Sequence, residues 1–165
     1  MPSPSQQEFR DAMARLGAAV TVVTTDGPAG RSGFTASAVC SVTDSPPTLL
    51  VCMNRGSRQN PIVKANGVLC VNVLAADQEA LSNLFAGRTG ADLADRFATA
   101  DWHTLATGAP ALSGAVAAMD CVVEEVLEKG THSVLFARVS AIRLGEPRSA
   151  LIWFSREYHP VGLPD

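Results

Sequence analysis

One segment of the chain concentrates small side chains and hydroxyl groups where a buried strand normally carries bulk. It reads Gly-Phe-Thr-Ala-Ser-Ala-Val-Cys-Ser-Val-Thr from Gly33 onward and is closed by Asp-Ser-Pro-Pro. Small residues allow a planar ligand to approach the main chain, whose N–H and C=O groups can bond its edge. The candidate contacts are Thr35, Ala36, Ser37, Ser41 and Val42. The alternative is an ordinary strand beside a crowded interior, and this segment alone does not separate the two.

A second polar cluster, Asn-Arg-Gly-Ser-Arg-Gln-Asn-Pro, begins at Asn54. Arg55 and Arg58 supply positive charge, and the hydroxyl of Ser57 can donate to a phosphate oxygen. Asn60 can cap a helix that starts at the following proline. A helix N-terminus favours an anion by roughly 0.3–1 kcal/mol at an exposed site. The cluster therefore predicts a phosphate-binding loop, and its alternative is a solvated surface loop.

The three histidines do not have the spacing of a metal site. His103, His132 and His159 lie far apart, and no H-E-x-x-H pattern occurs. His132 follows Gly130 and Thr131 in an expected turn, where binding residues often gather, although an exposed turn histidine needs no function. No G-x-S-x-G hydrolase signature is present. We expect no metal and keep His132 as the candidate catalytic residue.

The four cysteines, Cys40, Cys52, Cys70 and Cys121, form no C-x-x-C pair. Each occurs in an apolar, strand-like context, which is typical of buried free thiols in a reducing compartment. A catalytic cysteine would need a general base nearby, and the sequence indicates none.

The chain has 165 residues, 47% of them hydrophobic, which suits one domain with a real core. Its formal net charge is −3 and no basic block occurs, so we expect neither nucleic acid nor a membrane as partner. No apolar run approaches the roughly 20 residues of a membrane span. The N-terminus also lacks a signal-peptide pattern. We expect a single cytoplasmic domain over residues 1–165.

The first half of the chain predicts one helix followed by β-branched strands. A capping-box pattern at Ser5 is followed by Phe9, Met13 and Leu16 on one helical face, and Gly17 ends the helix. The strands expected next are 19–25, 32–43 as one strand or a bent pair, and 48–53, with a break at Pro46 and Pro47.

The second half predicts more strands than helices. A short helix should end near Gly67, and another, capped by Asp77, should end at Gly87. The segment 88–113 is polar and irregular, with one helical turn near 92–97. Strands are expected at 68–74, 116–128, 133–144 and 151–154, followed by a polar tail. Because βαβ spacing and a G-x-G-x-x-G pattern are both absent, the fold class is mainly β: an antiparallel, Greek-key-like barrel with a few peripheral helices.

Short stretches along nearly the whole chain match one family in that family's own order. They are 9–13, 35–36, 38–44, 51–52, 60–61, 69–74, 85–87, 96–97, 130–132 and 154–161. On these stretches the chain resembles the short-chain flavin reductases of two-component monooxygenases. The likeness is greatest to the small reductase component of the 4-hydroxyphenylacetate 3-monooxygenase system. Each stretch is weak alone, and the ordered set is specific.

The resemblance implies an FMN-binding split β-barrel that forms a homodimer, with flavin near the subunit interface. It also implies an NADH- or NADPH-dependent reductase of FMN or FAD, which hands free reduced flavin to a separate flavin-dependent monooxygenase. Carried over by position, the flavin-binding residues are Thr35, Ala36, Ser37, Ser41, Val42, Cys52, Asn54, Ser57, Asn60, Phe85, Arg88 and Tyr158. Among them, Ser57, Asn60 and Arg88 are expected to face the phosphate.

His132 occupies the place of a Gly-Asp-His motif that the family links to nicotinamide binding. Thr131 replaces the Asp here, so the preference for NADH or NADPH stays open. The implied reaction is hydride transfer from C4 of the nicotinamide to N5 of the flavin, and it needs no general base. Two alternatives remain: an FMN-retaining split-barrel oxidase of the pyridoxamine-phosphate oxidase type, and a non-catalytic flavin- or haem-binding barrel.

Overall fold

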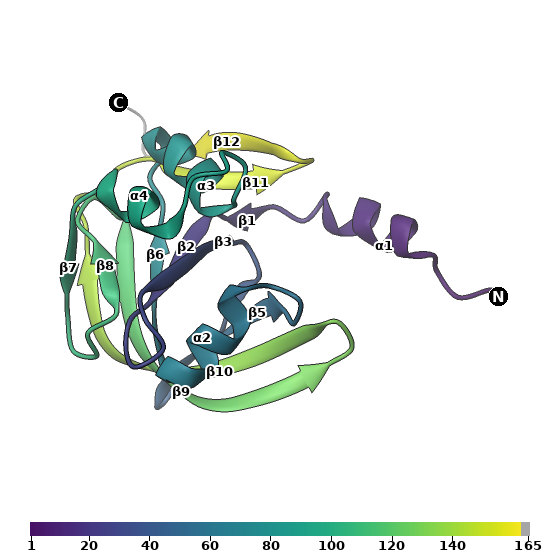
Figure 1. Ribbon diagram of the computed structural model, residues 1–165. Coiled ribbons are helices and arrows are strands. Elements are labelled where there is room, and N and C mark those ends of the chain that lie inside the picture. The colour runs from purple at the N-terminus through teal and green to yellow at the C-terminus, as the bar shows by residue number, and fades with distance from the viewer. Residues whose placement is uncertain (163–165) are drawn as a thin grey trace.

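A large antiparallel β-sheet dominates the computed structural model, which describes residues 1–162 (Figure 1). Its seven strands follow one another in the order β3-β2-β6-β9-β10-β5-β4. Their bounds are Thr21–Thr25 (β2), Ser32–Ala36 (β3), Val39–Asp44 (β4), Pro47–Asn54 (β5), Val68–Val73 (β6), Ala117–Lys129 (β9) and His132–Leu144 (β10). Every neighbouring pair is antiparallel, so the mainly β, antiparallel fold class is confirmed.

The two edge strands of this sheet are joined directly, which forces the sheet to curl. β3 ends at Ala36 and β4 begins at Val39, although the two strands lie at opposite ends of the strand order. Only Ser37 and Ala38 separate them, and a link of this length spans only about 10 Å when fully extended. The edges therefore approach each other at this link and close a barrel. Because β3 and β4 are not hydrogen-bonded neighbours, the barrel is split between them. Of the two alternatives that the sequence left open for 32–43, one strand or a bent pair, the structure shows the bent pair.

Short helices lie around the barrel (Figure 1). They are α1 (Gln6–Met13), α2 (Gln59–Asn66), α3 (Glu79–Phe85) and α4 (Leu93–Ala98), with the 3-10 turn η1 (Ala76–Gln78) before α3. Two predicted caps are wrong: Asn60 lies inside α2, whose N-cap is Arg58, and Asp77 lies within η1. The predicted ends are confirmed, because Gly67 and Gly87 adopt the left-handed φ angles of 67° and 76° that favour glycine.

Helix α1 extends away from the barrel, and none of its residues is buried (Figure 1). Its predicted capping box is confirmed, since Ser5 Oγ accepts from the N–H of Glu8 and the Glu8 carboxylate accepts from the N–H of Ser5. The helix ends at Met13, earlier than its glycine signal predicted. Its apolar stripe stays exposed: Phe9 shows 63% of its surface, Met13 46% and Leu16 62%. Over residues 1–162, no helix has the length and apolar character needed to cross a membrane.

Strand β2 lies between two hydrophobic cores and is buried along its whole length. Because side chains alternate across a strand, Val23 faces the core inside the barrel while Val22 faces a second core that includes residues of α3 and α4. The second core is aromatic: the rings of Phe85, Phe97 and Trp102 have centroids 5.0–5.7 Å apart. These rings fix α3 and α4 on the barrel, where both helices border the site.

Two smaller sheets complete the fold. Their strands are β1 (Ala18–Ala19), β7 (Trp102–Thr104), β8 (Pro110–Leu112), β11 (Ala150–Phe154) and β12 (Glu157–Val161). The strand predicted at 151–154 is confirmed, whereas the hairpin within 88–113 and the last strand lie where the sequence predicts irregular chain. β7 and β8 form a hairpin inside the segment 88–113. β12 pairs with β11, so the predicted polar tail is wrong. β7 and β8 have three residues each and β12 contains Pro160, so none of these three strands shows an alternating apolar pattern in the sequence.

Candidate functional site

A cavity of about 380 Å³, here named the central cavity, opens at the split of the barrel. The ends of β3, β5 and α3, the start of α2, and α4 form its walls. The lining residues are Phe34, Thr35, Ala36, Ser37, Ala38, Cys52, Met53, Asn54, Ser57, Gln59, Phe85, Ala86, Gly87 and Arg96. The structure thus brings together a first group of the predicted flavin contacts, namely Thr35, Ala36, Ser37, Cys52, Asn54, Ser57 and Phe85.

The β3 wall of the central cavity carries the small side chains of Thr35 and Ala36 beside Phe34. Its polar groups are bonded within the protein: Thr21 Oγ1 donates to Ala36 O at 2.7 Å, and Thr35 Oγ1 donates to Ser82 O on α3 at 2.6 Å. These bonds anchor the last two residues of β3, Thr35 and Ala36, before the bend at Ser37. A wall of this kind lets a planar ring lie close to the main chain.

The loop between β5 and α2 forms a polar part of the wall. Asn54 Oδ1 accepts from the N–H of Gly56 at 2.7 Å. Ser57 Oγ accepts from the N–H of Gln59 at 3.2 Å and donates to the Gln59 side-chain oxygen at 2.7 Å. The loop is therefore ordered by its own side chains, as short Asn- and Ser-containing turns commonly are.

Arg96 is the positive charge of the central cavity. It is half-buried on α4, and its Nε donates to Ala91 O at 2.8 Å. In the described part of the chain, no carboxylate lies within ion-pair distance of Arg96. Its two terminal nitrogens can therefore donate to an anionic group in the cavity.

The two arginines that the sequence indicated for phosphate binding do not line this cavity. Arg55 Nε lies 3.2 Å from the Glu128 carboxylate, and its Nη1 donates to Gly130 O at 3.2 Å. Arg58 is exposed at the N-cap of α2. A phosphate inside the central cavity would thus meet Arg96 rather than either of them.

A second cavity of about 200 Å³, the side cavity, adjoins the central cavity along β3 and the end of α3. Asn83 Oδ1 accepts from Tyr158 OH at 2.9 Å and from Arg88 Nη1 at 3.0 Å. Tyr158 OH also lies 2.8 Å from Ser82 Oγ, and the Arg88 guanidinium lies 5.4 Å from the ring centroid of Trp153. The predicted contacts Arg88 and Tyr158 therefore line the side cavity, next to the predicted contacts that line the central cavity.

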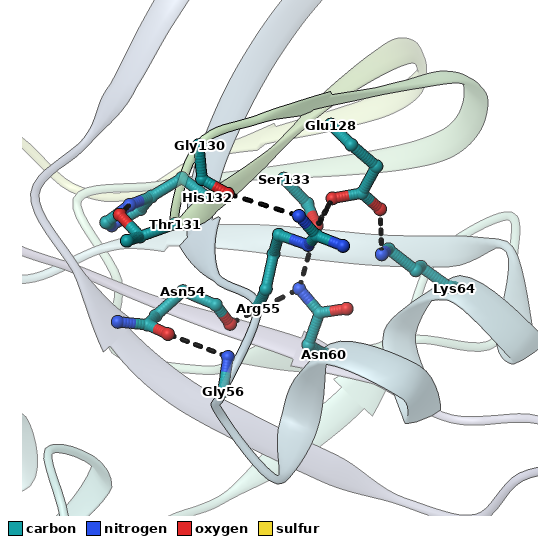
Figure 2. A network of polar contacts seen from close by, with 10 residues as sticks. All are labelled: Asn54, Arg55, Gly56, Asn60, Lys64, Glu128, Gly130, Thr131, His132 and Ser133. Carbon is teal, nitrogen blue, oxygen red and sulfur yellow. Dashed lines mark hydrogen bonds and ion pairs between the residues drawn. The ribbon is translucent and has the colours of Figure 1, made fainter.

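His132 lies outside both cavities but next to the wall of the central one. It is the first residue of β10 and pairs with Asn54 of β5 (Figure 2). Its side chain is exposed, and its Nδ1 lies 2.9 Å from Thr131 Oγ1. An exposed ring in this position is available to a ligand that approaches from solvent.

Three further predicted contacts do not line either cavity. Asn60 is buried behind the wall, where its amide donates to Asn54 O at 3.3 Å and to Ser133 Oγ at 3.0 Å. Ser41 and Val42 are exposed on β4. The bend after β3 carries β4 to the other side of the split, which separates these two residues from Thr35 and its neighbours.

Sequence reasoning missed Arg96, Gln59 and Trp153 as lining residues. Arg96 belongs to one of the family-like stretches, which was the available signal. Nothing in its local spacing shows that α4 faces the end of β3, because that contact depends on how the aromatic core packs.

The thiols give the cavity no nucleophile. Burial, helped by the nearby Asp120 carboxylate, raises the pKa of Cys121 to about 12 and also raises the pKa of Cys70. Burial and then the neighbouring Cys40 raise the pKa of Cys52, which lines the central cavity. These groups are therefore protonated near pH 7. Within residues 1–162, no group of three His, Cys, Asp or Glu side chains is arranged to hold a metal.

Comparison with known proteins identifies the family. The model of the flavin reductase like domain matches residues 13–162. The chain belongs to the flavin reductase like domain family. The protein named FMN reductase (NADH) RutF from Ancylobacter novellus is 62% identical to this flavin reductase over 165 residues, which are 99% of this chain and 90% of that protein.

Solved structures agree with the family. The NADH:FAD oxidoreductase SgcE6 of Streptomyces globisporus superposes with a TM-score of 0.88 at 28% identity, covering 99% of this chain and 98% of that one. The styrene monooxygenase flavin reductase SMOB of Pseudomonas putida S12 superposes with a TM-score of 0.82 at 29% identity, covering 94% of this chain and 98% of that one. The split-barrel fold is thus confirmed, whereas the finer likeness to 4-hydroxyphenylacetate reductases stays a prediction.

Proposed function

We propose that this flavin reductase transfers a hydride from NADH to FMN bound in the central cavity. The observation that carries the proposal is the two-part wall of this cavity: small residues along β3 and a half-buried cation, Arg96, on α4. The first part suits a flat isoalloxazine ring, and Arg96 together with Ser57 suits a phosphate. The relative from Ancylobacter novellus is named for the same two substrates.

The protein's contribution is to bind and orient. Bound flavin would supply the chemistry, because its N5 accepts a hydride from a reduced nicotinamide. The β3 main chain holds one face of the ligand, the bonded hydroxyls of Thr21 and Thr35 keep that wall rigid, and Phe85 keeps water from the inner end. No proton need be removed from either substrate, which agrees with a cavity whose thiol, Cys52, is protonated.

His132 positions the nicotinamide in this proposal. Its exposed ring stands beside Asn54, next to the cavity but not inside it. His132→Ala should therefore raise the KM for NADH and leave the Kd of FMN, measured by quenching of flavin fluorescence, nearly unchanged. Equal damage to both constants would contradict this role.

FMN and NADH are proposed as the working pair. Arg96 is available for one phosphate in the central cavity, which FMN satisfies without its adenylate extension. Among relatives, the Ancylobacter protein is named for FMN and the Streptomyces neighbour for FAD, and both names specify NADH. Initial rates with each flavin combined with NADH or NADPH decide the choice; faster turnover with FAD or NADPH would overturn it.

The reduced flavin is proposed to leave the protein and serve a separate flavin-dependent monooxygenase. The name of SMOB, a styrene monooxygenase flavin reductase, supports such a partner. Release requires modest affinity, and a Kd near 1 μM corresponds to about −8 kcal/mol. Gel filtration after mixing with FMN should strip the flavin from the protein. Flavin that stays bound would instead favour an oxidase of the pyridoxamine-phosphate oxidase type.

A homodimer is proposed to cover the exposed face of α1. A groove of about 850 Å³ runs beside this helix, with Phe9 and Leu16 in its lining, and shares Ser37, Ala38 and Cys52 with the central cavity. A second copy seated in the groove would remove apolar surface from water and close the central cavity on that side. Sedimentation should give a dimer for the wild type and a monomer for Leu16→Glu. A monomeric wild type would end this part of the proposal.

One assay tests the function as a whole. The protein is mixed with NADH and excess FMN, and the nicotinamide absorbance is followed over many turnovers. Continued loss of absorbance supports the reductase. Failure to oxidise NADH and NADPH alike would end the proposal and leave a non-catalytic flavin- or haem-binding barrel. In the proposal one domain, residues 1–165, acts in the cytoplasm, where the free thiols stay reduced.

A further inference from the structure

Glu128, near the end of β9, bonds side chains from three different elements (Figure 2). Its Oε1 pairs with Lys64 Nζ on α2. Its Oε2 lies 3.2 Å from Arg55 Nε, in the loop after β5, and accepts a 2.8 Å hydrogen bond from Ser133 Oγ on β10. One carboxylate thus balances two cations and a hydroxyl. The same contacts, Lys64 foremost, lower the pKa of Glu128.

These contacts continue inward to the wall of the central cavity. Ser133 is fully buried, and its Oγ accepts from Asn60 Nδ2 at 3.0 Å. Asn60 is buried too, and the same nitrogen donates to Asn54 O at 3.3 Å. Because Asn54 lines the cavity, an unbroken path of hydrogen bonds joins the carboxylate at the surface to the cavity wall.

Arg55 carries a second path, which leads to the turn before His132. Its main-chain N–H donates to Thr131 O at 2.9 Å. Its Nη1 donates to Gly130 O at 3.2 Å (Figure 2). An exposed arginine left alone samples many rotamers, so the pairing with Glu128 keeps the guanidinium on the turn. The two paths together set where the turn stands relative to the cavity wall.

We propose that Glu128 is a positioning residue for hydride transfer, which holds the His132 turn against the cavity wall through Arg55 and Ser133. The proposal rests on the role of His132 proposed above, because Glu128 itself touches neither ligand. Without its charge the two cations are no longer balanced. A neutral side chain in its place would give the buried hydroxyl of Ser133 a weaker acceptor, which would loosen the link to the turn. Nicotinamide binding should therefore suffer before flavin binding does.

Glu128→Gln tests the proposal, because it removes the charge with little change in shape. We expect the KM for NADH to rise about tenfold. The Kd of FMN should change by less than about twofold, and the melting temperature should stay close to that of the wild type, because exposed ion pairs contribute little to stability. The matched control is Glu124→Gln on the same strand, whose partner Arg138, at 2.6 Å, does not contact the turn. This control should leave all three quantities near wild type.

A double variant separates positioning from a general structural effect. In a His132→Ala background, Glu128→Gln should add nothing to the KM for NADH, because both changes act through one side chain; additive effects would overturn the proposal.

If Glu128→Gln fails to fold, Arg55→Met replaces it and should reproduce the rise in KM. If His132→Ala leaves NADH kinetics unchanged, the role of His132 fails and this proposal with it. If only the Glu128 and Arg55 variants are silent, this proposal alone fails.

Discussion

Arg96→Met should weaken the binding of FMN far more than the binding of riboflavin. The two flavins differ only in the phosphate, and Arg96 is the cation that lines the central cavity. Met keeps the length and the apolar stem of the side chain but has neither the charge nor the donors. Any general loosening of α4, including loss of the 2.8 Å bond to Ala91 O, acts on both flavins alike and cancels in their ratio.

The size of the effect follows from the surroundings of the guanidinium. Hydrogen bonds to charged groups contribute about 1.5–3 kcal/mol, and about 1.4 kcal/mol is a tenfold change in affinity, which together give roughly 10- to 150-fold. Arg96 is only half-buried, so water screens part of the interaction. We therefore expect the lower end: the ratio of the FMN Kd to the riboflavin Kd rises about tenfold.

Fluorescence titration of the two flavins, without nicotinamide, measures this ratio directly. Arg58→Met is the matched control, because Arg58 is exposed and lies outside both cavities. It should leave the ratio unchanged. If Arg96→Met weakened riboflavin as much as FMN, or if Arg58→Met had the larger effect on FMN, the phosphate would not lie against α4 and the orientation proposed for the flavin would be wrong.

Three other outcomes are expected. Ser57→Asp should place a negative charge beside the phosphate and weaken FMN more than riboflavin in the same titration, and equal effects would mean that the loop does not hold phosphate. Asp120→Asn should lower the free energy of unfolding by about 1–3 kcal/mol, because the buried Asp120 carboxylate accepts from the N–H groups of Ala106 and Thr107 at 2.7 Å each. The melting temperature should then fall by roughly 2–12 °C, and an unchanged value would contradict this role. A disulfide reagent at pH 8 should leave Cys70 and Cys121 unmodified in the native protein and reach all four thiols after unfolding, since burial favours the protonated form of both; four fast thiols in the native state would refute that assignment.

Local patterns predicted the long elements of the fold well. The capping box at Ser5 and the two long strands near the C-terminus depend on residues close in sequence, so they could be read directly. The hairpin of β7 and β8 and the pairing of β12 could not, because such short strands exist only through the partners that they meet in space. The two wrong caps, Asn60 and Asp77, have a related cause. Helix α2 begins two residues earlier than predicted and α3 one residue later, so neither residue lies at the cap position of an α-helix.

For the site, the sequence determined the chemistry that is present and the structure decided which groups meet. Small residues at Thr35, Ala36 and Ser37 and the polar loop at Ser57 are properties of consecutive residues, and they do lie in one cavity. The sequence could not tell which arginine faces that cavity. Arg55 pairs with a carboxylate and Arg96 lines the central cavity because of contacts between distant segments. The charge of an arginine does not by itself specify which group the side chain meets.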